Sequence, residues 1–301
     1  MNIGAYFNII SALLTGEHAI QPSDVTGVIF KNNQPEQFVR LDSENFSLSV
    51  DPSDTIIFII HGWMESRSVA WYKELTDALL KQNEKNVVVQ VDWSKGSKMQ
   101  RDAAVKNNKP TGEIIGTFIS NLMKNNQLLH SQIHLIGFSM GGQVSGFAGK
   151  TVQSLTNEKI GRITALDPSG RSYNEKPPDQ RLNPEDAEVV AVIHTDTVHI
   201  GFHDSCGTVD LFVNGRVYPQ PGCPDEIDLI ELMYCSHFRA YRYLIEAVNK
   251  NRLIGTKCES YQKYEQGQCS GNETLDFVGA ISPEVRGVYY VKTRPKPPFF
   301  E

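Results

Sequence analysis

The 301-residue sequence predicts an α/β fold with a mostly parallel central sheet and helices on both of its faces. Short runs of β-branched residues alternate with longer segments that carry apolar residues at helical spacing, as in a sheet wound by crossover helices. The runs are also almost continuously apolar, which is typical of parallel strands because they are buried on both faces.

Five runs predict strands, and they are TIIFII at 55–60, NVVVQVDW at 86–93, QIHLIGF at 132–138, GRITALD at 161–167 and AEVVAVIHTD at 187–196. Apolar residues at helical spacing over 111–124 predict a crossover helix, with Thr111 as its N-cap. A helix rich in small residues is predicted directly after residue 139. Residues 258–301 are rich in Gly, Pro and Tyr, and they end in a predicted strand and a proline-rich tail.

Length and composition indicate one ordinary globular domain over residues 25–301. The net charge of -6 argues against a nucleic-acid partner, since such proteins carry a basic surface. No apolar run is long enough to span a bilayer. Residues 1–24 begin with an apolar stretch that lacks basic residues, and we interpret them as a possible signal peptide or an N-terminal extension.

The segment IGFSMGGQ at 136–143 places Ser139 between two glycines, after a predicted buried strand and before a predicted helix. A G-x-S-x-G pattern occurs by chance in roughly one chain in ten of this length. The flanking strand and helix give the pattern its meaning, because a sharp turn between them exposes the hydroxyl of a nucleophilic serine. Such a serine needs a histidine as its base and a carboxylate that orients the histidine.

Asp167 is the candidate acid, because it ends the predicted strand that follows Ser139 and is itself followed by proline. A carboxylate there lies at the carboxyl edge of the sheet, where such folds bind ligands. Three other carboxylates compete for the role, and they are Asp196, Asp204 and Asp210.

Four histidines follow the candidate acid, and they are His194, His199, His203 and His237. His194 lies inside a predicted strand, which favours a structural role, whereas His199 and His203 lie in a loop without an anchor. His237 follows Cys235 and precedes a predicted helix. A half-cystine and a packed helix would both hold the ring still, so we predict that His237 is the base.

An ester hydrolysed by a serine also needs two backbone donors for the oxyanion. The residue after the nucleophile, Met140, supplies one of them. Trp63 supplies the other, because Gly62 follows the first long predicted strand and allows the chain to turn the Trp63 N–H inward.

Together these motifs resemble the pancreatic-lipase family, and more closely its secreted insect branch, which includes the vespid venom phospholipases A1. The likeness covers about residues 25–300. It rests on eight segments in the family's order, and they are FIIHGW, VDWSKG, HLIGFSMGGQVSGFAGK, ITALDPSG, AVIHTD, QPGC, YCSHFRAYRY and GVYYVKTRPKPPF.

The resemblance implies an α/β-hydrolase fold, a Ser139–Asp167–His237 triad, and an oxyanion hole formed by Trp63 and Met140. It implies a secreted, extracellular serine esterase, and phospholipase A1 is the expected activity. A neutral triacylglycerol lipase or a galactolipase is the alternative, and a non-catalytic relative similar to insect yolk proteins is an alternative of another class. The expected partner is a phospholipid or an acylglycerol at a membrane or lipid interface.

All five cysteines lie in the last third of the chain, which favours disulfides formed in an oxidising compartment. The resemblance implies the pairs Cys223–Cys235 and Cys258–Cys269. The first pair would close a short lid over residues 224–234, which is similar to the phospholipase A1 branch. Cys206 is left over, and we interpret it as a buried free thiol rather than a link to another chain.

Two departures from the family's pattern remove partners. A C-terminal β-sandwich is not expected within the sequence, so we expect no colipase. We also expect a monomer. The calcium-binding stretch of the pancreatic enzymes is only partly kept, because Arg181 and Asp186 fit it but Pro178 and Asn183 stand where acidic ligands belong. We therefore expect no metal and no cofactor.

Overall fold

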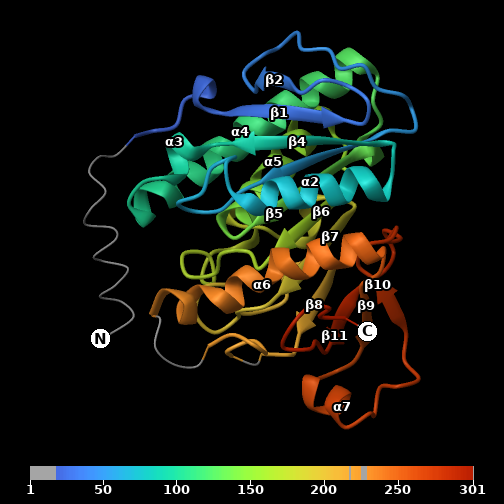
Figure 1. Ribbon diagram of the computed structural model, residues 1–301. Coiled ribbons are helices and arrows are strands. Elements are labelled where there is room, and N and C mark those ends of the chain that lie inside the picture. The colour runs from blue at the N-terminus through green and yellow to red at the C-terminus, as the bar shows by residue number, and fades with distance from the viewer. Residues whose placement is uncertain (1–17, 217, 225–228, 301) are drawn as a thin grey trace.

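A single eleven-stranded sheet runs through the computed structural model, which describes residues 18–216, 218–224 and 229–300 (Figure 1). The strands follow the order β10-β9-β11-β8-β7-β6-β5-β3-β4-β1-β2. Within the described residues no separate β-sandwich is present, because all eleven strands belong to this sheet. Most of the predicted N-terminal segment, residues 1–17, lies outside the described residues.

Seven neighbouring strands are parallel, which confirms the predicted fold class. They are β4 (Asn86–Asp92), β3 (Thr55–Ile60), β5 (Ile133–Phe138), β6 (Arg162–Leu166), β7 (Val189–His194), β8 (Val209–Val213) and β11 (Gly287–Val291). Almost every residue of β3 to β8 is buried, as expected for strands covered on both faces. The run VDLFV that forms β8 was not predicted to be a strand.

Antiparallel strands extend the sheet at both edges. On one side β1 (Thr26–Lys31) pairs with β4 and with β2 (Gln37–Arg40). On the other side β9 (Ile254–Lys257) pairs with β11 and with β10 (Thr274–Asp276).

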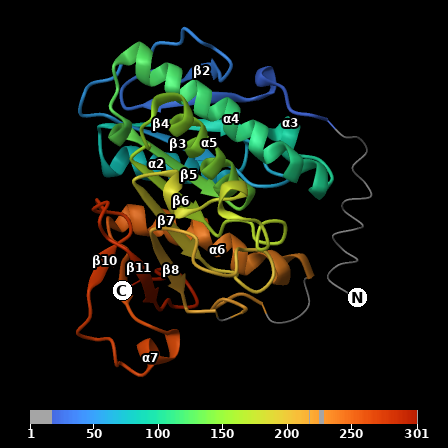
Figure 2. The same cartoon turned by 180° about the vertical axis from the view of Figure 1, so that it is seen from behind.

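Helices cover both faces of the sheet. One face is covered by α2 (Ala70–Gln82) and α6 (Leu229–Lys250), which lie in front of the strands in Figure 1. The other face is covered by α4 (Arg101–Asn126) and α5 (Met140–Thr156), which come to the front in Figure 2. Two hydrophobic clusters fill the two layers between helices and sheet. The shorter elements are α3 (Ser94–Ser97), α7 (Tyr261–Glu265), and the 3-10 turns η1 (Pro22–Asp24), η2 (His130–Gln132), η3 (Pro178–Gln180) and η4 (Pro184–Asp186).

The predicted start of the crossover helix at Thr111 is wrong. Helix α4 begins ten residues earlier, and Thr111 lies in its interior, where the hydroxyl donates a hydrogen bond to the Asn107 carbonyl at 2.7 Å. Pro110 is also inside the helix. The first turns carry polar side chains that are buried and hydrogen-bonded, such as Asn108, whose amide donates to the Tyr173 hydroxyl at 2.7 Å. Apolar spacing therefore could not reveal them.

The prediction that His237 precedes a helix is wrong, because His237 lies within one. Helix α6 begins at Leu229 and includes both Cys235 and His237. Among the described residues, no helix combines the length and the apolar character needed to cross a membrane.

Candidate active site

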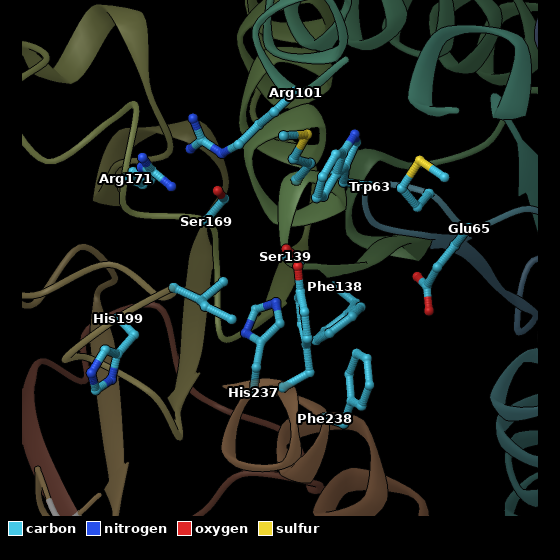
Figure 3. A pocket seen from close by; sticks show the side chains of 14 residues that line it. Trp63, Glu65, Arg101, Phe138, Ser139, Ser169, Arg171, His199, His237 and Phe238 are labelled. Atoms are coloured by element: carbon cyan, nitrogen blue, oxygen red, sulfur yellow. The ribbon is translucent and has the colours of Figure 1, made fainter. Parts of the chain in front are cut away.

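The carboxyl ends of three neighbouring parallel strands bring the candidate residues to one edge of the sheet. Trp63 follows β3, Ser139 follows β5 and Asp167 follows β6, while His237 reaches the same edge from α6. A cavity of about 330 Å³ opens there and is lined by Trp63, Ser139, Met140 and His237 (Figure 3).

Ser139 lies at a strained turn between β5 and α5. Its φ of 55° and ψ of -118° are rarely adopted by residues other than glycine. A hydrogen bond to the neighbouring strand holds the turn in place, since the Ser139 N–H donates to the Leu166 carbonyl of β6 at 3.0 Å. A Cβ on Gly137 would lie 2.2 Å from the Gly141 carbonyl, and a Cβ on Gly141 would lie 2.1 Å from the Ile60 carbonyl. Both glycines of the motif are therefore needed to pack α5 against the sheet.

Asp167 and His237 form a buried pair, in which His237 Nδ1 lies 2.6 Å from Asp167 Oδ2. The other carboxylate oxygen accepts two backbone hydrogen bonds, from Thr195 at 2.7 Å and from Asp196 at 2.9 Å. A carboxylate can only accept, so Nδ1 carries the proton and Nε2 is left as the acceptor. The imidazole points toward the Ser139 side chain (Figure 3).

Two of the competing histidines, His194 and His203, lie in surroundings that give them no catalytic role. His194 is fully buried in β7, where Nε2 lies 2.8 Å from Asp210 Oδ1 and the ring stacks on Phe212. Because Asp210 contacts His194, it does not serve as the acid of the candidate site. The His203 side chain is exposed, and its backbone N–H donates to Asn174.

Asp204 is exposed and pairs with Arg216, so it does not reach the site. Asp196 is buried beside Asp167, and its Oδ1 accepts the His199 N–H at 3.0 Å. Burial raises the pKa of Asp196, and repulsion by the Asp167 carboxylate raises it further. Asp196 is thus a neighbour of the buried pair rather than its acid. His199 lines the cavity.

The loop that carries Trp63 is fixed by hydrogen bonds on each side. The Gly62 N–H donates to Glu65 Oε2 at 2.8 Å, the Trp63 indole N–H donates to the Met99 carbonyl at 2.8 Å, and the Met64 N–H donates to Ser97. Met140 is the first residue of α5, so its N–H has no acceptor within the helix. The backbone N–H groups of Trp63, in a fixed loop, and of Met140, at a helix start beside Ser139, are suitable donors for an oxyanion.

The cavity has one aromatic wall and one cationic wall. Phe138 and Phe238 lie on one side of Ser139, while Arg101 and Arg171 lie on the other, next to Ser169 (Figure 3). Sequence reasoning missed both arginines, because neither belongs to a catalytic motif. Arg171 lies four positions after Asp167, and this proximity to the candidate acid was the signal available.

Two disulfides are present, Cys223–Cys235 and Cys258–Cys269, and Cys206 is a buried free cysteine. Of the predicted lid over 224–234, residues 225–228 lie outside the described residues. The Cys206 thiol, His194 and Asp210 place potential ligand atoms within 4.8 Å of one another. Asp210 Oδ1 already accepts the Cys206 N–H at 3.0 Å and contacts His194, which makes this cluster a structural network.

The residues that correspond to the family's calcium-binding stretch do not fit a metal ion, because a lysine ammonium group stands where the ion would bind. Lys150 Nζ lies 2.6 and 2.7 Å from the two Asp186 oxygens and 2.7 Å from the Arg181 carbonyl. The Asn183 amide also donates to Asp186 at 2.9 Å, so it acts as a donor and not as a metal ligand. Burial is the main cause that raises the pKa of Asp186, to about 6.

Comparisons with known proteins match the sequence to lipases. The model of the lipase family matches residues 10–299. Lipase member H-B of Xenopus laevis is 37% identical over 219 residues, which are 71% of this chain and 46% of that protein. Pancreatic triacylglycerol lipase of Myocastor coypus is 32% identical over 264 residues, 80% of this chain and 56% of that protein.

The chain thus spans about half the length of the curated relatives it matches. Among solved structures, the carboxylesterase of Bacillus cereus aligns with a TM-score of 0.33 and 11% identity, over 74% of this chain and 80% of that one.

Proposed function

Because the chain belongs to the lipase family, the family of the pancreatic lipases, and has an α/β-hydrolase fold, we propose that it is a serine esterase of glycerolipids. Ser139, His237 and Asp167 are its triad. The observation that carries the proposal is the buried His237–Asp167 pair at 2.6 Å, whose imidazole points toward a serine at a strained turn.

In the proposed reaction, His237 Nε2 takes the Ser139 proton while the serine oxygen attacks the carbonyl carbon of the acyl ester. The backbone N–H groups of Trp63 and Met140 bind the resulting oxyanion. His237 then returns the proton to the leaving glycerol oxygen, and an acyl-enzyme remains. Water, activated by the same imidazole, hydrolyses the acyl-enzyme and releases the fatty acid. Asp167 holds the ring and stabilises the imidazolium.

Phospholipase A1 is the activity that we propose within this class. Only residues 224–234 separate the half-cystines of the Cys223–Cys235 disulfide, and a short lid leaves room for a polar head group at the cavity. The cationic wall supports the same choice, because a neutral triglyceride offers no anion to it. A neutral triacylglycerol lipase or a galactolipase is the alternative. The proposed site of action is extracellular, as the two disulfides suit an oxidising compartment.

Two experiments test this function in order. A fluorophosphonate should label the wild-type protein and leave Ser139→Ala unlabelled, whereas an unlabelled wild type would favour a non-catalytic relative. Phosphatidylcholine with different acyl chains at its two positions should then lose the sn-1 chain. A triglyceride emulsion is assayed beside it for comparison. Faster release from the triglyceride would overturn the phospholipase assignment.

A further inference from the structure

The guanidinium group of Arg101 is buried in the wall of the cavity without a full set of partners. Its side chain is 15% exposed, and within the described residues its Nη2 atom has no hydrogen-bond acceptor. Asp102 lies 3.6 Å from Nη1, but the Asp102 side chain is 92% exposed and faces solvent. A charged donor without an acceptor is costly, and Arg101 lines the cavity, so an anion bound there would offset the charge of the guanidinium as a whole.

A second guanidinium faces the first. Arg171 lines the same cavity, and the two side chains extend toward one another with the Ser169 hydroxyl beside them (Figure 3). Burial lowers the pKa of Arg101, and repulsion by Arg171 is the second cause. Two cations that repel each other beside a candidate nucleophile form an arrangement that an anion would relieve.

Guanidinium groups suit phosphate oxygens, because their planar forks donate two parallel hydrogen bonds to one group. In a glycerophospholipid only the glycerol carbons separate the acyl ester from the phosphate. A cavity of about 330 Å³ can therefore hold both, with the ester at Ser139 and the phosphate at the arginines.

Building on the proposed function, we propose that Arg101 and Arg171 bind the substrate's phosphate and so select phospholipids over neutral glycerolipids. The aromatic wall formed by Phe138 and Phe238 lies on the opposite side of Ser139 and receives the acyl chain (Figure 3). Polarity across the cavity thus orients the lipid, with the head group toward α4 and the chain toward α6.

The kinetic test compares two monomeric substrates, so that binding to a lipid surface does not contribute. Arg101→Gln and Arg171→Gln should each lower kcat/KM for a short-chain phosphatidylcholine about tenfold or more. The kcat/KM of each variant for p-nitrophenyl butyrate should stay within about twofold of the wild-type value. Arg252→Gln, an exposed arginine outside the cavity, is the matched control and should change neither. Arg101→Lys should recover part of the loss. Equal losses on both substrates, or no loss on the phospholipid, would overturn the proposal.

A binding test separates this proposal from the proposed function. Ser139→Ala should bind sn-glycerol 3-phosphate in a phosphorus NMR titration, and Ser139→Ala with Arg101→Gln should lose this binding. Because no turnover is needed, the anion site is judged even if the wild type proves unable to cleave phospholipids. Binding that is equal in both variants would refute the phosphate site while leaving the esterase assignment intact.

Discussion

His237 Nδ1 donates to Asp167 Oδ2 over 2.6 Å, and both side chains are buried. In Asp167→Asn, the amide can turn its NH2 group toward the ring, which favours the tautomer that carries hydrogen on Nε2 and cannot accept the serine proton. We expect kcat for p-nitrophenyl butyrate to fall by about 10³- to 10⁴-fold with KM little changed. Asp204→Asn, at an exposed competitor in the sequence, should keep full activity. A loss below tenfold at Asp167 would exclude it as the triad acid.

The pH dependence of stability should respond to Asp196. Burial and then repulsion by Asp167 raise the pKa of its carboxyl, so the folded protein binds this proton more tightly than the unfolded chain does. In Asp196→Asn the side-chain oxygen still accepts the His199 N–H, but the negative charge is gone. An ionised Asp196 lowers the free energy of unfolding at neutral pH, so Asp196→Asn should raise Tm there, and this gain should disappear in acid, where the wild-type carboxyl is protonated. No gain in Tm at neutral pH, or an equal gain at both pH values, would contradict a buried charge at Asp196.

Removing Lys150 should destabilise the fold. Lys150→Ala leaves the Asp186 carboxylate buried without its cation, which costs about 3 kcal/mol in the free energy of unfolding. Lys73→Ala removes an exposed partner of Asp77 and should cost less than about 1 kcal/mol. Urea denaturation measures both.

The same contacts predict that calcium is not needed. A chelator should leave the wild-type Tm and the esterase activity unchanged, since Lys150 already neutralises Asp186. A clear drop in Tm on chelation would contradict this account of the Asp186 region.

Helix α5 should tolerate no side chain at Gly141. A Cβ there would lie 2.1 Å from the Ile60 carbonyl of β3, so Gly141→Ala must push the helix away from the sheet. We expect a loss of about 1–3 kcal/mol in stability and a larger proportional loss of activity, because Ser139 directly precedes the helix. Gly271→Ala is the control, as no atom lies within 4 Å of its added Cβ. Unchanged thermal unfolding in both variants would refute the close packing of α5.

The central sheet could be predicted because its strands are buried on both faces and therefore read as continuous apolar runs. The edge strands β2 and β10 could not, since they are short, are not buried along their length and lack such a run. Helix α4 was truncated in the prediction because the apolar spacing begins only after Thr111, whereas the structure starts the helix at Arg101 and keeps Pro110 in its interior.

The triad candidates were accessible from sequence because their order and their places after strands are constrained by the chemistry. The cationic wall was not accessible, since Arg101 and Arg171 are brought together only by the folding of α4 against the loop after β6. A guanidinium also has no spacing rule of its own, unlike a serine that needs a base. Cavity geometry was required to see it.

Lys150 has a further consequence through its tether. A free ion occupies its site according to its concentration in the surrounding fluid, and dilution or a competing ligand can remove it. An ammonium group attached to α5 stays at a high effective concentration beside Asp186 under all such conditions. Because α5 begins directly after Ser139, the lysine that binds the Arg181–Asp186 region belongs to the same helix that follows the proposed nucleophile. The structure of this region therefore depends on the chain itself and not on an ion from the surrounding medium.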